Sequence, residues 1–190
     1  MKKIYWLILA LSPAFYFSCK GKQKNDFLPV LSFLQSQVRH VDTTLYSIIK
    51  AEKTGTDSTW DTSYVKREDF RKLANDFLDI PDLTNFSLGK KYKEERIYDD
   101  QMNRVIIVYT PVRGDQEIIR EELVVGPGDT AFDKMKSVII EKIKDYKDSS
   151  IHQHLLWQTN EKFQVVTIIE KNGQPVSTKT MEVTWNKRED

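Results

Sequence analysis

The stretch Asn-Arg-Val-Ile-Ile-Val-Tyr-Thr-Pro-Val, residues 103–112, decides the fold because it is apolar over the length of one β-strand. Residues 105–109 contain no polar interruption, and residues 165–169 are similar, with only Thr167 breaking the run. Strands that are covered on both faces tend to be continuously apolar, whereas half-covered strands alternate between apolar and polar residues. We therefore predict that both runs are central strands covered on both faces.

Five further segments share the β-branched and aromatic character of these two runs, and Asp, Asn, Gly, Pro or Ser residues separate them. The segment 90–98 is mostly charged, which is typical of an edge strand or of a solvated face. The connections are short and predict antiparallel neighbours, because a parallel crossover needs about a dozen residues or more. The seven predicted strands are 90–98, 103–112, 117–125, 136–143, 151–158, 162–170 and 176–185.

Two amphipathic helices are predicted before these strands. The first is expected to start at Asp26, which can cap it, and Pro29 is tolerated in its first turn. The second is expected to start near Glu68 and to end before Pro81. Each helix has one apolar stripe, which must pack on another layer. The stripes are Phe27, Val30, Leu31, Leu34, Val38 and Val41, and then Phe70, Leu73, Ala74, Phe77 and Leu78.

Between the helices, residues 43–52 and 59–65 favour strands, and Thr54-Gly55-Thr56-Asp57 between them is typical of a turn. This pattern predicts a β-hairpin. The complete prediction is an α+β fold, in which two N-terminal helices and a β-hairpin pack on a curved antiparallel meander sheet of about seven strands. The curvature could close the sheet towards a half-barrel.

The N-terminus has the pattern of a secretory leader. Lys2 and Lys3 precede the segment 4–17, which is apolar apart from Ser12. This segment is shorter than the roughly 20 apolar residues that a membrane-spanning helix needs. We therefore predict that residues 1–18 are a removable signal peptide, residues 19–25 a tether, and residues 26–190 a single α+β domain.

The leader ends at the only cysteine of the chain, and Tyr16-Phe17-Ser18-Cys19 resembles a bacterial lipobox. The resemblance implies that Cys19 carries a diacylglyceryl group, often with further acylation such as palmitate at its amine, and becomes the first residue of the mature protein. Such a protein is exported and anchored by its lipid to a bacterial membrane, here expected to be the outer membrane. The alternative is an ordinary leader followed by an unpaired cysteine.

The mature chain is similar to uncharacterised lipoproteins of Bacteroidota at Val41-Asp42-Thr43-Thr44, at Arg67-Glu68-Asp69-Phe70-Arg71-Lys72-Leu73-Ala74 and at Trp185-Asn186. The segment Gln23-Lys24-Asn25-Asp26 resembles the charged export signals of their surface proteins, although a solvated spacer would have the same composition. This similarity implies a location and an architecture, but it transfers no activity and no catalytic residue.

The charge balance argues against nucleic acid as a partner. The chain has 29 Lys and Arg residues against 28 Asp and Glu residues, and loss of Lys2 and Lys3 with the leader lowers the basic count to 27. Nucleic-acid binding needs a concentrated positive surface, whereas here both signs alternate along the chain. With one cysteine, an intramolecular disulfide is excluded as well.

His152 and His154 are the weak candidates for metal ligands. They are two residues apart on a predicted strand, so both side chains lie on one face. Leu155 and Trp157 belong to the opposite, core-like face, which places the histidines towards solvent. A site would need a third ligand, such as His40 or an acid. We therefore predict no metal and no other cofactor.

Three other motifs favour turns or exclude a known chemistry. Asp99-Asp100, followed by Gln101 and Asn103, lacks the glycine and the distal glutamate of an EF-hand and favours a hairpin turn over a calcium site. Gly126-Pro127-Gly128-Asp129 lacks the Lys-Ser/Thr of a phosphate-binding loop and also predicts a turn. The chain has no Gly-x-Ser-x-Gly elbow for a serine nucleophile.

The aromatic residues are spread along predicted strands, where packing in the core is the simplest expectation. If the concave side of the sheet were open, they could instead line a groove for a lipid tail, a glycan or a peptide. The residues concerned are Trp60, Tyr92, Tyr98, Tyr109, Trp157, Phe163 and Trp185.

These observations predict a non-catalytic, lipid-anchored protein of the cell envelope that serves as a binding or structural module for an envelope partner. The alternative is a carrier or sensor of an apolar ligand held in a half-barrel groove, and a weaker alternative is a metal-dependent hydrolase. A large apolar cavity would favour the carrier, whereas a solid core under both helices would favour the module.

Overall fold

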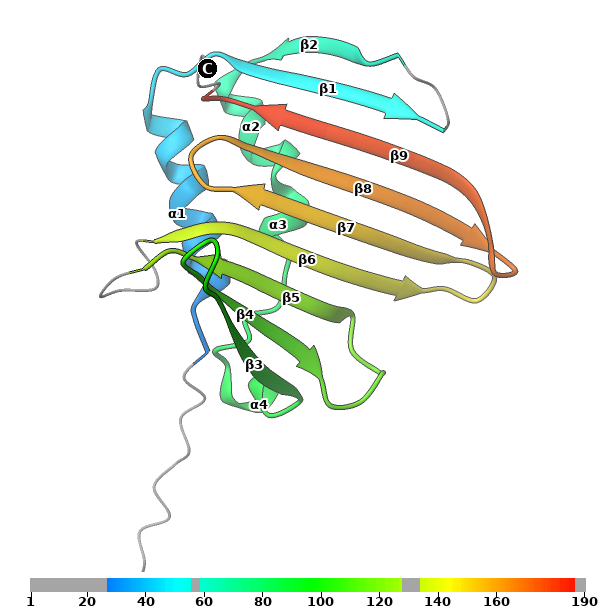
Figure 1. Cartoon of the computed structure of the whole chain (residues 1–190). Helices are drawn as coiled ribbons and strands as arrows, with labels where there is room; N and C mark the ends of the chain where they lie inside the picture. The colour runs from blue at the N-terminus through cyan, green and yellow to red at the C-terminus, as the bar shows by residue number, and fades with distance from the viewer. Residues whose placement is uncertain (1–26, 56–58, 128–133, 187–190) are drawn as a thin grey trace, which may run out of the picture.

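The chain forms one large antiparallel sheet with helices on one side (Figure 1). The computed structural model describes residues 27–55, 59–127 and 134–186. Within these ranges the sheet has nine strands, in the order β2-β1-β9-β8-β7-β6-β5-β4-β3. Their bounds are β1 Ile48–Thr54, β2 Asp61–Val65, β3 Tyr92–Asp99, β4 Arg104–Pro111, β5 Ile118–Val125, β6 Met135–Asp145, β7 Ser150–Gln158, β8 Lys162–Lys171 and β9 Gln174–Thr184.

The predicted meander is confirmed, because β3 to β9 follow one another in space as they do along the chain. Each of these seven strands overlaps one predicted run and pairs antiparallel with the next. The charged strand β3 is an edge of the sheet, as its composition predicts. Its charged side chains disfavour pairing with another chain along that edge.

The prediction for the hairpin is only partly right. Strands β1 and β2 pair with each other, and Gly55, which follows β1, has a φ of +67° that glycine adopts without strain. The hairpin does not pack on the sheet, however, because β1 pairs with β9 in the register Ile49↔Thr184 and extends it. This pairing satisfies the outer backbone groups of β9, and it brings the sheet to nine strands instead of seven.

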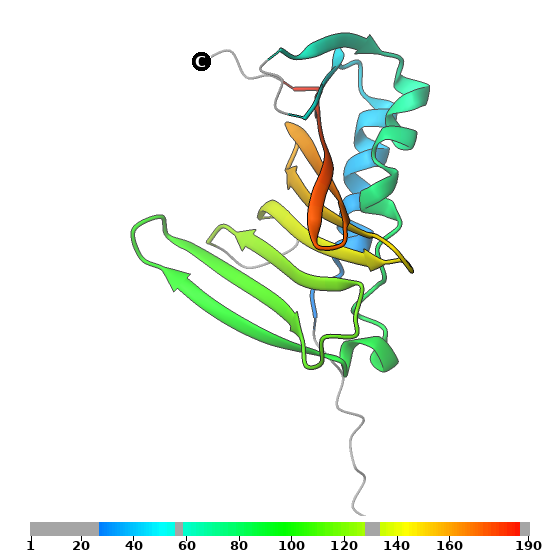
Figure 2. The ribbon, with the colours of Figure 1, turned by 90° about the vertical axis from the view of Figure 1, so that its right-hand side faces the viewer.

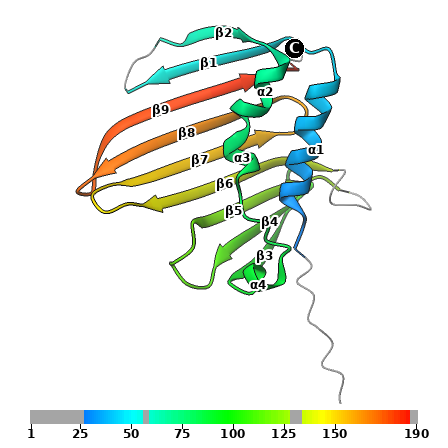
Figure 3. The same ribbon diagram turned by 180° about the vertical axis from the view of Figure 1, so that it is seen from behind.

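Both long apolar runs lie in interior strands, each paired on both sides: 105–109 in β4 and 165–169 in β8. Strand β8 is near the middle of the sheet, whereas β4 lies next to the edge strand β3. The expected cover on both faces is not seen. Figure 3 shows α1, α2 and α3 together on one face of the sheet, and no helix of the described residues lies on the other. The long apolar runs therefore have one face in the core and one face that no described helix covers, although Val108 on that second face is only 4% exposed.

The helices begin and end at positions that backbone chemistry explains. Helix α1 (Val30–Thr43) starts after Pro29, which has no amide hydrogen to donate, and not at Asp26, which is outside the described residues. The second predicted helix is divided at Ala74 (φ −82°, ψ 4°) into α2 (Arg67–Leu73) and α3 (Asn75–Leu78). A further short helix, α4 (Phe86–Gly89), precedes β3.

An aromatic cluster fills the core between the helices and the sheet. Trp157 and Phe163 are cross-strand neighbours with stacked rings 5.2 Å apart. Phe77 contacts the Trp157 ring edge-on at 5.1 Å, and Phe70 contacts Trp185 in the same way at 5.2 Å. Four of these five side chains are fully buried and Trp185 is 2% exposed, so the cluster leaves no space for a ligand between its rings.

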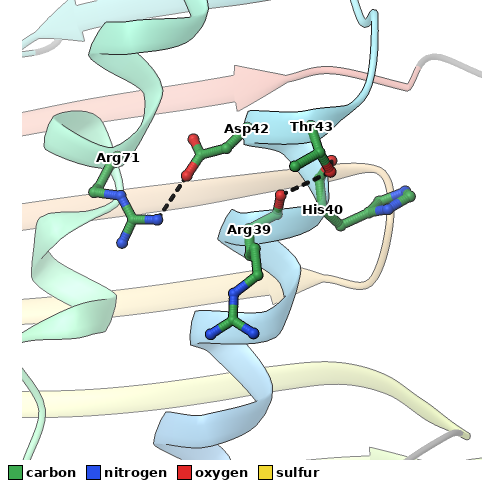
Figure 4. Close-up of polar contacts among 5 residues, drawn as sticks. All are labelled: Arg39, His40, Asp42, Thr43 and Arg71. Carbon is green, nitrogen blue, oxygen red and sulfur yellow. Dashed lines mark hydrogen bonds and ion pairs between the residues drawn. The ribbon is translucent and has the colours of Figure 1, made fainter.

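A polar contact also joins the helices at the surface. The Arg71 guanidinium donates to the Asp42 carboxylate at 2.6 Å and links α2 to the end of α1 (Figure 4). At the same end, the Thr43 hydroxyl donates to the Arg39 carbonyl at 3.0 Å. An ion pair this exposed contributes at most about 1 kcal/mol, so packing of the apolar stripes holds the helices on the sheet.

The sheet is curved and open. Viewed along its edge in Figure 2, the β3–β4 hairpin leans away from the helices and projects beyond the uncovered face. The two edge strands, β2 and β3, lie at opposite ends of the sheet and do not pair. The sheet therefore forms a trough and not a closed barrel. None of the helices in the described ranges has the length and hydropathy needed to span a membrane.

Candidate functional site

The uncovered face of the sheet is the candidate functional site. On β7, the buried residues Leu155 and Trp157 point towards the helices. Neighbouring residues of a strand point to opposite faces, so His154 and Leu156 belong to the uncovered face. The cross-strand pairs extend this assignment over the other strands, since directly paired residues share a face.

Six aliphatic side chains form a diagonal stripe across this face, and all six are half-buried. Ile106 of β4 lies directly opposite Val124 of β5, and Ile139 of β6 lies directly opposite Leu156 of β7. The stripe shifts along the strand direction between β5 and β6 and between β7 and β8. On β8, for example, Val166 lies opposite His154, two residues before Leu156. The diagonal stripe consists of Ile106, Val124, Ile139, Leu156, Val166 and Ile168.

Two ion pairs lie beside the diagonal stripe. Arg120 donates to Glu122 on β5, and the Lys162 ammonium lies 3.1 Å from the Glu182 carboxylate. Arg120 also lies near Glu95 and Glu141, so this part of the face has more acidic than basic groups. The chemistry of the face is therefore that of an apolar contact with a polar rim, as in protein interfaces.

The size of this face suits a protein partner. Strands lie ~4.8 Å apart and rise ~3.3 Å per residue, so β4 to β8 offer a surface on the order of 600 Å². A standard protein interface buries roughly 800 Å² on each partner. With the leaning β3–β4 hairpin as a wall, the trough could supply most of that area (Figure 2).

His152 and His154 lie on the uncovered face but have no third ligand. The Nε2 atom of His152 lies 3.2 Å from the Ser150 hydroxyl and 3.5 Å from the Glu170 carboxylate. His40 is on α1, on the other side of the sheet, where its Nε2 atom contacts the Tyr46 hydroxyl at 3.1 Å. Within the described residues, no three His, Cys, Asp or Glu side chains are grouped as metal ligands would be.

We expect protein purified without an affinity tag to melt at the same temperature with and without a chelator. The double variant His152→Gln, His154→Gln should behave like the wild type, because two exposed ligands bind a metal too weakly to stabilise the fold. Differential scanning calorimetry and elemental analysis make the comparison. Stoichiometric metal that disappears in the double variant, with a chelator-sensitive wild type, would instead establish a metal site.

Glu121 on β5 is the most unusual ionisable residue among those described. It is 1% exposed, faces the helices, and neither of its carboxyl oxygens has a hydrogen-bond partner. Burial in this apolar site raises the pKa of Glu121 to about 8, with a smaller contribution from the negative charge of Asp82. The side chain is therefore a neutral acid at pH 7. Groups with such perturbed pKa values cluster at functional sites.

Three surface cavities, bounded entirely by described residues, have volumes of about 490, 330 and 400 Å³. The first has mainly polar walls, the second is mixed, and the third has more apolar than polar wall. All three carry charged side chains, whereas a carrier for apolar molecules typically has a predominantly apolar lining with few polar groups. The first is lined by Glu52, Lys53, Thr54, Thr59, Trp60, Asp61 and Lys179, the second by Lys90, Lys91, Val112, Arg113, Asp115 and Gln116, and the third by Lys50, Ser63, Tyr64, Val65, Lys66, Asp69, Lys72 and Leu73.

The other residues singled out in the sequence have these positions. Asp99 begins the β3–β4 turn, where its carboxylate accepts from the amides of Gln101 and Met102 at 3.0 and 3.2 Å. The turn predicted at 126–129 is described only for Gly126 and Pro127, and Cys19 lies outside the described residues.

The aromatic residues are divided between the core and the surface. The core ones include Tyr92, Tyr109, Trp157, Phe163 and Trp185, whereas Trp60 and Tyr98 are 42% and 59% exposed. The open face is thus lined by aliphatic residues and not by the aromatic ones that a groove was expected to use.

No protein-family model, no curated protein and no solved structure matches this chain. Any functional role of the uncovered face and of Glu121 must therefore be argued from the geometry of this chain alone.

Proposed function

We propose that this protein is a non-catalytic module of the bacterial cell envelope, anchored by a lipid on Cys19, which binds a protein partner through the uncovered face of its sheet. The observation that carries the proposal is the diagonal stripe: six aliphatic side chains on a face that no described helix covers. Exposed apolar surface of this extent is typical of interaction sites.

Two features favour a protein over a small apolar ligand. The core under the helices is filled by the aromatic cluster, so a ligand would have to occupy the shallow trough. The trough is lined by aliphatic side chains with ion pairs and acidic groups beside them, which matches the apolar centre and polar edge of a protein interface. A partner with a convex, apolar surface fits this description.

The experiment places a photocrosslinking amino acid at position 156, in the diagonal stripe, and at position 112 as a control. Val112 is 62% exposed and follows β4, so it offers an apolar position outside the trough that is more accessible than Leu156. We expect a specific crosslinked protein from position 156 only. The identified protein is then purified, and its binding is measured by calorimetry.

In that measurement Leu156→Lys should weaken binding at least tenfold, because an ammonium group in an apolar contact must be desolvated without a partner. Val112→Lys should leave the affinity unchanged. Equal crosslinking from both positions, or equal affinity for both variants, would exclude the trough as the binding site. A product of twice the mass of the chain would instead identify a second copy as the occupant.

The anchor is tested separately. Cys19→Ala should remove incorporation of labelled palmitate and move the protein from the detergent phase to the aqueous phase, since a diacylglyceryl group can only form on the cysteine thiol. Fractionation of labelled cells measures both effects. Ser18→Ala is the control, because alanine is also small and should leave processing intact. Label retained in Cys19→Ala would refute lipidation at this residue.

A further inference from the structure

Glu121 lies where two crossing segments meet the sheet. The N-terminal segment, residues 27–29, leads into α1, and the connection, residues 79–85, joins α3 to α4. Figure 3 shows the connection descending from α3 across the sheet to α4, beside the N-terminal end of α1. Ile80 and Leu83 of the connection are 5% and 3% exposed, so this segment is part of the core.

The N-terminal segment is attached to a residue that adjoins Glu121. Tyr109 on β4 is the cross-strand neighbour of Glu121, and its hydroxyl accepts the amide hydrogen of Leu28 at 3.0 Å. The Phe27 ring packs on the Tyr109 ring with centroids 4.6 Å apart. Within the connection, the Asp82 carboxylate accepts from the Thr84 amide at 3.0 Å, and the negative charge of Asp82 acts on Glu121.

No described positive charge is available to stabilise an ionised Glu121. The surrounding ionisable groups are Asp82 from the connection, Tyr109 from β4, Tyr92 with Glu94 and Arg96 from β3, Asp115 and Glu117 from the segment that precedes β5, and Lys142 from β6. Arg96 pairs with Glu94, and the Lys142 ammonium lies 3.4 Å from the Glu117 carboxylate. The N-terminal segment and the first turns of α1 contribute no charged side chain.

We propose that Glu121 is a proton-operated latch: while its carboxyl group is protonated, the N-terminal segment and the connection stay closed over the sheet, and its ionisation releases them. An ionised carboxylate at this position needs water, which can enter only if one of the covering segments lifts. The connection is the segment driven outward, because Asp82 carries the like charge. This inference is independent of the proposed binding function.

The latch predicts a specific dependence on pH. Glu121 has a pKa of about 8 in the closed state, whereas a solvated glutamate has the ordinary value of 4.5. The open state therefore binds fewer protons between these values. The opening equilibrium constant should rise about tenfold per pH unit from about pH 5 to pH 8, and it should level off above pH 8.

Amide hydrogen exchange measured by nuclear magnetic resonance tests the latch, with protection factors used to remove the intrinsic pH dependence of exchange. In the wild type, the protection of the Leu28 and Thr84 amides should fall through this pH window. The Val165 amide, on a strand paired on both sides, should remain more strongly protected. In Glu121→Gln, which mimics the neutral acid, the protection of Leu28 and Thr84 should be independent of pH.

Asp82→Asn is the second variant in this experiment. Its amide oxygen can still accept from the Thr84 amide, but its negative charge is lost. In this variant the protection should level off at a lower pH than in the wild type. Protection of Leu28 and Thr84 that is flat with pH in the wild type, or that still falls in Glu121→Gln, would overturn the latch. Protection of Leu28 and Thr84 that equals the protection of Val165 at every pH would show that these amides exchange only through global unfolding, and it would overturn the latch as well.

Discussion

Leu155→Asp should unfold the protein at room temperature. Leu155 is fully buried on β7 and directly paired with Ile140 of β6 and Val165 of β8, so the new carboxylate would face apolar side chains on both adjacent strands. An uncompensated buried charge costs several kcal/mol or more, which approaches the total stability of an ordinary domain at ~5–15 kcal/mol. Circular dichroism and urea denaturation measure the loss.

The matched control is His154→Asp, one residue earlier on the same strand. His154 is exposed on the uncovered face, opposite Glu141, so the change should cost under about 1 kcal/mol from the new pair of like charges. Similar urea midpoints for the two variants would mean that the two faces of β7 are assigned incorrectly.

Glu121→Gln should have the second largest effect, and it should stabilise the protein. Between pH 4.5 and 8 the folded state keeps a proton on Glu121 that the unfolded state loses, so the free energy of unfolding of the wild type falls as pH rises through this window. Glutamine mimics the neutral acid and does not titrate. The variant should therefore be more stable than the wild type by up to roughly 3 kcal/mol at pH 7, and equally stable at pH 4.

Urea denaturation at pH 4, 6, 7 and 8 measures this difference. Glu122→Gln is the control, because Glu122 is the adjacent acid on the opposite face, where it pairs with Arg120. Loss of this partly exposed ion pair should cost at most about 1 kcal/mol and should leave the pH dependence in place. A Glu121→Gln variant that gains nothing at pH 7, or gains equally at pH 4, would refute a buried neutral acid.

The local elements of the fold could be predicted from the sequence, but their long-range arrangement could not. Alternation of apolar residues identifies each strand of the meander, because the period of two is a property of the strand itself. Which strand receives the β1–β2 hairpin depends instead on the free edges of the finished sheet. The same holds for the helices: an apolar stripe shows that a helix is covered, but not which face of the sheet covers it.

Both the burial of Glu121 and the uncovered face of the sheet have signals in the sequence. In the run 117–125, a period of two places Glu121 on the same face as Leu123 and Val125, which are core residues. An acid in phase with core positions is the sign of a buried carboxyl group. The open face had a signal in the doubly apolar run 105–109, but such a run indicates cover on both faces whether a helix or a binding partner supplies it.

The pairing of β1 with β9 connects residues near the beginning of the described chain with residues near its end. During synthesis β1 and β2 are made long before β9. Until β9 is present, the β1–β2 hairpin is an isolated pair of strands, which is marginally stable in water. Strands β3 to β9 pair with neighbours that are joined to them by short connections, so each pairing closes a short loop. Pairing of β1 with β9 closes the longest loop in the sheet and carries the largest entropic cost. Docking of the hairpin should therefore be the slow, final event of folding, and a chain shortened before β9 would leave both β8 and the hairpin with unpaired edges that invite aggregation.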